Sequence, residues 1–83
     1  MTYEQIQEKI YSYIMETYEL EGDDMYTPDV NLFDYGYLSS MDAVAVIAWI
    51  ESEFDVEISQ KDIILYPMNT VEEIAMVVDS KLN

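Results

Sequence analysis

The most informative segment of this chain is Asn31-Leu-Phe-Asp-Tyr-Gly-Tyr-Leu-Ser-Ser-Met-Asp42, and it runs directly into the apolar segment 43–50. The pattern predicts a loop through Gly36 that delivers two serines to the start of a helix. Ser39 has the position of an N-cap, and Asp42, three residues later, can bond back to the Ser39 amide. Ser40 then falls in the first helical turn, where its hydroxyl is not needed for capping. We therefore interpret Ser40 as a candidate attachment point.

Four places in the sequence have the pattern of a helix start. In each, a polar N-cap candidate is followed three residues later by a side chain that can reach back to its amide. The pairs are Thr2 with Gln5, Ser39 with Asp42, Ser59 with Asp62, and Thr70 with Glu73. Four such starts in 83 residues predict an all-α fold with four helices.

The expected elements follow from spacing and from helix-breaking residues. Apolar side chains recur at helical spacing from about residue 3 to 20, and Gly22 stands just beyond that end. A long loop is expected over 21–38, and loops of this length are often functional. A short third helix is expected over 60–65, stopped by Pro67, and a last helix over 71–81.

The segment 44–50 is ambiguous by pattern, because a continuous apolar run also suits a buried strand. Three alanines, the capping box and the extension through residue 53 favour a helix. The sequence therefore predicts a single domain over 1–83. It should be a small four-helix bundle with a long loop between the first two helices and a short third helix.

Two apolar stripes separate when residues 40–54 are placed on a helix. The expected core stripe contains Ala43, Val46, Ile47, Ile50 and Phe54. The opposite stripe, with its acidic edges, gives the predicted partner-binding residues Met41, Asp42, Val44, Ala45, Ala48, Trp49 and Glu51. A domain this small has little left to cover a second stripe, so it is expected to be a docking surface. The alternative is that loop residues such as Leu32 and Tyr37 fold over it.

Composition restricts the function classes. The net charge is −15, from 18 acidic residues against three lysines, so nucleic acid and anionic membranes would repel the chain and a basic protein would attract it. The acidity alone is equally compatible with a role in solubility. A hydrophobic content of 51% argues against disorder.

Missing residue types exclude several kinds of chemistry. There is no cysteine and no histidine, so a disulfide framework, a thiolate nucleophile and the common general base are all absent. Ser40 has no base to activate it and is expected to be a substrate of another enzyme rather than a catalyst. The acidic residues lack the spacing of a calcium loop, so no metal site is expected. No signal peptide and no apolar run of about 20 residues is present, which predicts a cytoplasmic protein without membrane insertion.

The motif Leu32-Phe33-x-x-Gly36-x-Leu38-Ser39-Ser40-Met41, followed by an apolar helix and by Glu51-Ser-Glu-Phe-Asp-Val-Glu-Ile58, resembles the acyl carrier protein family. In that family the serine of an Asp-Ser-Leu or Asp-Ser-Met motif carries a 4′-phosphopantetheine arm derived from coenzyme A. The resemblance implies that Ser40 is this serine. The chain departs from the family at Ser39, where an aspartate is usual, and this departure is expected to affect the efficiency of modification.

The resemblance also implies a function and partners. The thiol of the arm would hold an acyl or aminoacyl group as a thioester, and a stand-alone, monomeric carrier would move it between enzymes. The implied partners are a phosphopantetheinyl transferase, an activating ligase and an acceptor transferase. Gly36 stands four positions before Ser40, as in D-alanyl carrier proteins, whereas fatty-acid carriers place glycine one residue closer. The alternative is a carrier-like module that is not modified and only binds a basic partner.

Overall fold

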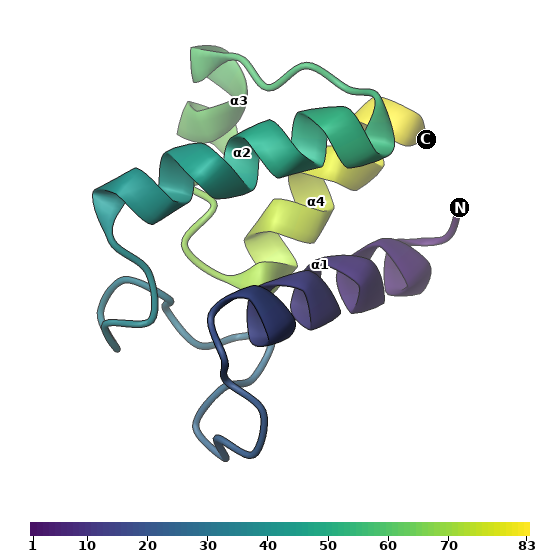
Figure 1. Cartoon of the computed structure of the whole chain (residues 1–83). Helices are drawn as coiled ribbons and strands as arrows, with labels where there is room; N and C mark the ends of the chain where they lie inside the picture. The colour runs from purple at the N-terminus through teal and green to yellow at the C-terminus, as the bar shows by residue number, and fades with distance from the viewer.

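The computed structural model describes residues 1–83 and consists of four α-helices without strands: α1 (Tyr3–Thr17), α2 (Ser40–Phe54), α3 (Gln60–Leu65) and α4 (Val71–Leu82). The three longer helices enclose the core, the short α3 lies to one side, and the long connection between α1 and α2 lies at one end (Figure 1). The predicted four-helix, all-α fold is confirmed. None of the helices combines the length and the apolar character needed to cross a membrane.

The helix starts are set by local capping, largely as predicted. Reciprocal capping boxes begin α1, α2 and α3, with the N-caps Thr2, Ser39 and Ser59. At α4 the prediction is half right. Thr70 Oγ1 accepts from the Glu73 amide at 3.0 Å, but the Glu73 carboxylate accepts from the Asn69 amide at 3.0 Å. This carboxylate therefore holds the incoming loop rather than closing the box.

The first helix ends at Thr17, three residues before the predicted end at residue 20. Its termination uses Glu19, whose backbone is left-handed with a φ of 56°. The Leu20 amide then donates to the Met15 carbonyl at 2.8 Å, the six-to-one bond of a Schellman-type ending. Gly22 was the expected terminator, and this was wrong. The apolar spacing continues past the end because Leu20 packs back onto the core without being helical.

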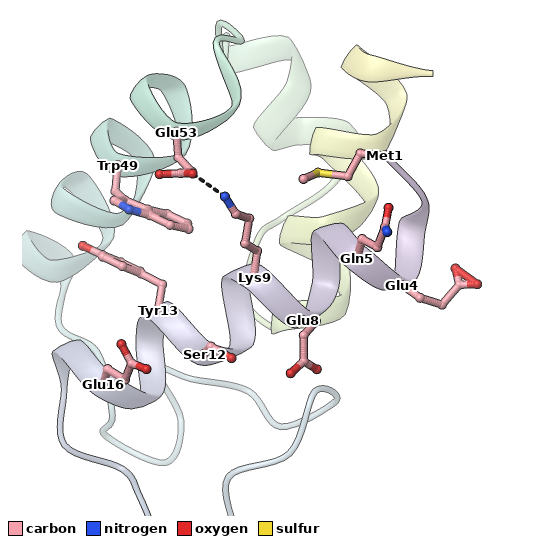
Figure 2. A pocket seen from close by; sticks show the side chains of 10 residues that line it. All are labelled: Met1, Glu4, Gln5, Glu8, Lys9, Ser12, Tyr13, Glu16, Trp49 and Glu53. Carbon is pink, nitrogen blue, oxygen red and sulfur yellow. Dashed lines mark hydrogen bonds and ion pairs between the residues drawn. The ribbon is translucent and has the colours of Figure 1, made fainter.

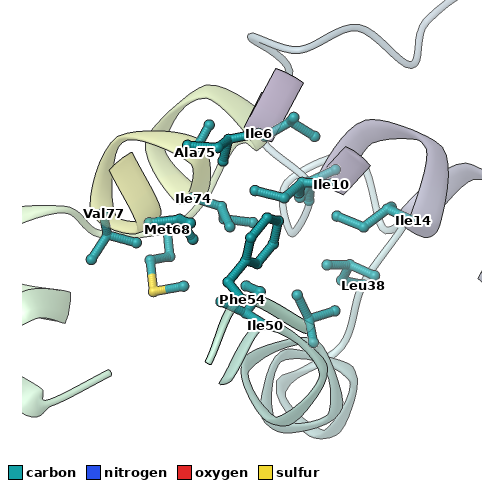
Figure 3. Packing of buried hydrophobic residues seen from close by; sticks show 14 of the residues in the cluster. Ile6, Ile10, Ile14, Leu38, Ile50, Phe54, Met68, Ile74, Ala75 and Val77 are labelled. Carbon is teal, nitrogen blue, oxygen red and sulfur yellow. The ribbon is translucent and has the colours of Figure 1, made fainter. Parts of the chain in front are cut away.

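The core is formed by apolar side chains from α1, α2, α4, the long connection and Met68 in the segment before α4 (Figure 3). Ile6, Ile10 and Ile14 give α1 one fully buried stripe. On α4 the residues predicted to face inward, Ile74, Val77 and Val78, are all buried. The remaining buried residues are Tyr26, Val30, Leu32, Leu38, Val46, Ile50, Phe54, Met68, Val71 and Ala75. No charged residue is buried among them, and the Tyr26 hydroxyl has a hydrogen-bond partner, so the core stabilises the fold chiefly through apolar burial.

The long connection between α1 and α2 is held in place by specific bonds. Leu32 is fully buried, and its amide donates to the Asn69 carbonyl at 2.8 Å. The Tyr26 hydroxyl donates to the Tyr11 carbonyl at 2.7 Å and the Tyr11 hydroxyl donates to the Tyr26 carbonyl at 3.0 Å, with the two rings stacked 4.4 Å apart. Burial raises the pKa of Tyr26, so its hydroxyl stays a donor. The connection therefore presents the start of α2 in a defined position.

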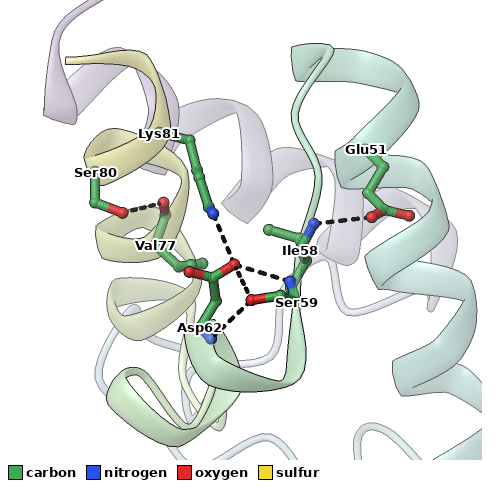
Figure 4. A network of polar contacts seen from close by, with 7 residues as sticks. All are labelled: Glu51, Ile58, Ser59, Asp62, Val77, Ser80 and Lys81. Atoms are coloured by element: carbon green, nitrogen blue, oxygen red, sulfur yellow. Dashed lines mark hydrogen bonds and ion pairs between the residues drawn. The ribbon is translucent and has the colours of Figure 1, made fainter.

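A polar network fixes α3 against α4 and the preceding loop (Figure 4). The Asp62 carboxylate accepts from the Ser59 amide at 2.8 Å, from the Ser59 hydroxyl at 2.9 Å and from Lys81 Nζ at 2.7 Å. The Lys81 bond, followed by those from Ser59, lowers the pKa of Asp62 to about 2. On the other side of the loop, the Glu51 carboxylate accepts from the Ile58 amide at 2.9 Å.

Candidate functional site

Two adjacent serines at the start of α2 differ in role: Ser39 caps the helix, and Ser40 is exposed to solvent. Ser39 Oγ accepts from the Asp42 amide at 3.3 Å, while the Asp42 carboxylate accepts from the Ser39 amide at 2.9 Å and from its hydroxyl at 3.0 Å. The predicted N-cap is thus confirmed. Ser40 is the first residue of the helix, is exposed, and takes no part in these bonds. Its hydroxyl is left available for a covalent link.

The backbone around Ser40 suits a phosphate ester. The first bond along the helix is donated by the Ala43 amide to the Ser39 carbonyl at 3.0 Å. The amides of Ser40 and Met41 precede that bond and have no partner within the helix. Together with the dipole of a 15-residue helix, they favour a negative group at this end. The residues present therefore fit a phosphodiester on Ser40.

The site has no means of activating Ser40 from within the chain. The chain contains no histidine, and the carboxylate nearest along the chain, that of Asp42, is bound to Ser39. No group of three or more side chains is arranged to hold a metal ion. Ser40 thus lacks the histidine base that activates the serine nucleophile of hydrolases.

The outer face of α2 beside Ser40 is open. Met41 is 83% exposed and Val44 is 69% exposed, and Ala45 and Ala48 are also exposed, as predicted. The alternative, a loop folded over this stripe, is not what the structure shows. Leu32 is fully buried in the core, and Tyr37 packs edge-on against Tyr26 with ring centroids 5.9 Å apart. The stripe beside Ser40 is therefore an exposed apolar face of α2.

Comparison with known families then identifies the chain. Residues 8–78 match the family described as phosphopantetheine attachment site. The chain belongs to this family. The match spans α2, α3 and most of α1 and α4, so it covers most of the bundle rather than the serine motif alone. No curated protein matches the chain in a sequence comparison.

The family assignment confirms two expectations from the sequence. The resemblance to acyl carrier proteins is confirmed, and 4′-phosphopantetheine is the covalently attached group of this family. The protein is therefore a phosphopantetheine-dependent carrier, and domains of this kind typically act as carriers rather than as catalysts.

Three residues predicted to bind partners already make contacts within the protein itself. The Trp49 ring stacks on Tyr13 of α1 with centroids 3.8 Å apart, and Trp49 is only half-exposed. Glu51 holds the Ile58 amide, and Asp42 holds the helix cap. Their helical positions are as expected, but any contact they make with a partner must coexist with these bonds.

The inner stripe of α2 differs from the prediction in one respect. Val46, Ile50 and Phe54 are buried as expected, whereas Ala43 and Ile47 are only half-buried. These two residues line a cleft of about 240 Å³ between α2, α3 and the segment before α4. Its lining residues are Phe33, Leu38, Ala43, Val46, Ile47, Ile63, Pro67, Met68, Asn69 and Ile74. Sequence reasoning missed this cleft. The sequence signal was the apolar run Ile63-Ile64-Leu65 in α3, because a helix of six residues cannot bury all three of these side chains.

Proposed function

We propose that this protein is a stand-alone carrier whose Ser40 bears 4′-phosphopantetheine and which transfers an acyl or aminoacyl group between enzymes. One observation supports the proposal most directly. Ser39 caps α2, whereas Ser40 is exposed and takes no part in the cap. When bound, the arm supplies the thiol that a chain without cysteine lacks, and this thiol holds the cargo as a thioester.

The residues of the chain position the attachment point. Ser39 and Asp42 close the cap from both sides, so the first turn of α2 is held in one conformation. The free amides of Ser40 and Met41 stabilise negative charge on a group attached to the Ser40 oxygen. Because Ser40 faces solvent, a group attached there can enter the active site of another protein.

The exposed face of α2 is the proposed contact for the phosphopantetheinyl transferase, the activating ligase and the acceptor transferase. Met41, Val44, Ala45 and Ala48 form its apolar centre. On α3, Ile64 is 80% exposed and Leu65 is 63% exposed, which gives a second apolar area for the same class of partner. The net charge of −15 favours partners with a basic surface around their own active site. A monomer and a cytoplasmic location stay predictions.

The cargo we propose is small and of the aminoacyl type. Gly36 stands four positions before Ser40, as in D-alanyl carriers. The cleft that Ala43 and Ile47 line has a volume of about 240 Å³. This is below the range of about 300–1,000 Å³ common for pockets that enclose drug-sized ligands. A short acyl or aminoacyl group suits this site better than a long acyl chain.

The attachment site is tested by intact mass spectrometry after incubation with coenzyme A and a broad-specificity phosphopantetheinyl transferase. The wild-type chain should gain one arm. Ser40→Ala should gain none and should keep its helical circular dichroism. Ser39→Ala is the matched control, because it removes the cap but leaves the attachment hydroxyl. Labelling of Ser40→Ala, or labelling that moves to Ser39, would contradict the assignment. A wild-type chain that stays unlabelled with several transferases would favour the unmodified interaction module.

A further inference from the structure

A second hollow lies along α1, on a different part of the surface from the attachment site. It is an open groove of about 770 Å³ (Figure 2). Its lining residues are Met1, Glu4, Gln5, Glu8, Lys9, Ser12, Tyr13, Glu16, Trp49 and Glu53. The α1 residues recur once per turn from one end of the helix to the other, a length of roughly 22 Å. The two α2 residues lie more than two turns beyond Ser40 and thus away from the attachment site.

Two stacked aromatic rings form the floor of the groove. The rings of Tyr13 and Trp49 are stacked with an angle of 8° between their planes, which joins α1 to α2. Lys9 reaches from α1 to the Glu53 carboxylate on α2, as the dashed line in Figure 2 shows. Lys9, the one basic side chain of the groove, is therefore already paired, and its aliphatic part adds to the floor.

The rim of the groove is acidic and unpaired. Glu4, Glu8 and Glu16 are exposed on α1, and none of them makes an ion pair. Glu4 and Glu8 are one turn apart, so their side chains are separated by about 6 Å at Cβ. In Figure 2 the Glu8 side chain points away from α2, on the outer side of α1. An apolar floor beside a row of uncompensated carboxylates complements a segment that is basic along one edge and apolar along the other.

We propose that this groove binds a basic amphipathic segment of a partner protein, with a lysine or arginine about once per helical turn. The charges would pair with the α1 glutamates and guide the encounter, while aliphatic side chains would lie on the aromatic floor. The groove is too long and open to enclose a small molecule. A partner held here would cover Trp49 but leave Ser40 and the exposed apolar centre of the outer α2 face free for a second enzyme. The inference does not depend on modification of Ser40.

The test uses the full, unmodified chain and a synthetic peptide of about four helical turns, with one lysine per turn and leucines between. Trp49 is the only tryptophan and lies in the groove, so its fluorescence reports occupancy directly. The lysine peptide should change this signal saturably, and the effect should weaken with added salt. A peptide with glutamate in place of each lysine should give no change. Absence of any Trp49 response to the lysine peptide would overturn the proposal.

A matched pair of charge variants separates groove binding from general attraction to an acidic protein. The double variant Glu8→Gln with Glu16→Gln should weaken binding about two- to thirtyfold. The control Asp34→Asn with Glu57→Gln removes the same charge from exposed sites outside the groove and should leave the affinity unchanged. Equal weakening by both variants would overturn the proposal. So would NMR shift changes centred on Met41 and Val44 rather than on Trp49.

Discussion

The Trp49 ring of α2 lies flat against the Tyr13 ring of α1, with centroids 3.8 Å apart and planes inclined by 8°. This contact joins the two long helices on the side of α2 away from the cleft that Ala43 and Ile47 line. It also explains why Trp49, at the margin of the outer apolar stripe, is half-buried. The stack therefore ties one edge of α2 to α1 and leaves Met41 and Val44, nearer the start of α2, exposed.

The stack is expected to contribute to stability beyond the area that it buries. In a double-mutant cycle with Tyr13→Leu and Trp49→Leu, we expect a coupling free energy of about 0.5–1.5 kcal/mol. Urea unfolding followed by circular dichroism measures it without relying on the tryptophan signal. A coupling near zero would mean that the two rings are merely adjacent.

Substitutions on the buried face of α2 should destabilise the protein more than substitutions on its exposed face. Phe54→Ala should lower the free energy of unfolding by about 3–5 kcal/mol, because its side chain is buried in the core. Ile47→Ala should cost clearly less, since Ile47 is half-buried beside a cleft. Val44→Asn should stay within about 0.5 kcal/mol of the wild type, because Val44 is exposed.

The same Val44→Asn variant tests the docking face. It should melt like the wild type but be loaded or discharged more slowly by the partner enzymes. Glu57→Asn is a matched control on an exposed residue outside the face. Should Val44→Asn unfold the protein, the stripe is part of the core and the docking face is wrong.

The residue before the attachment serine should influence the rate of modification. Ser39→Asp restores the acid usual in the family and should speed loading by a phosphopantetheinyl transferase. Stability should change by less than about 1 kcal/mol, because serine and aspartate are both good N-caps. Rates of the two proteins are compared side by side by mass spectrometry. A slower variant would indicate a transferase adapted to Ser39.

Acid should loosen α3 through Asp62. The pKa of this carboxyl is lowered from 3.8 to about 2 in the folded protein, chiefly by Lys81. The stabilisation it provides is therefore fully present above pH 3.8 and is lost as the pH falls toward 2. NMR titration of the Asp62 carboxyl measures this midpoint directly.

A pair of lysine variants identifies the cause of that shift. Lys81→Met should raise the pKa of Asp62 toward 3.8. Lys61→Met removes an exposed lysine that makes no ion pair and should leave the midpoint unchanged. Equal shifts in both variants would show that the general charge of the protein, rather than the Lys81 bond, sets the pKa.

The sequence alone determined the features that depend on neighbours along the chain. An N-cap residue and its N3 partner lie within four consecutive residues, so the starts of all four helices could be located from residue types. Ser39 and Ser40 could be distinguished for the same reason, since N-cap and first-turn positions have different requirements. The end of α1 was misplaced because Glu19, which is not glycine, adopts the left-handed conformation that stops the helix.

Only the tertiary structure decided which residues of α2 are left for partners. Helical spacing assigns a side chain to a face but cannot show what lies opposite that face. Ala43 and Ile47 line a cleft because α3 stands across from them, and Trp49 is held by Tyr13, which is distant in sequence. The acidic groove arises in the same way, where the polar side of α1 meets the edge of α2. Each of these features depends on packing between helices, and that information is not local to any one of them.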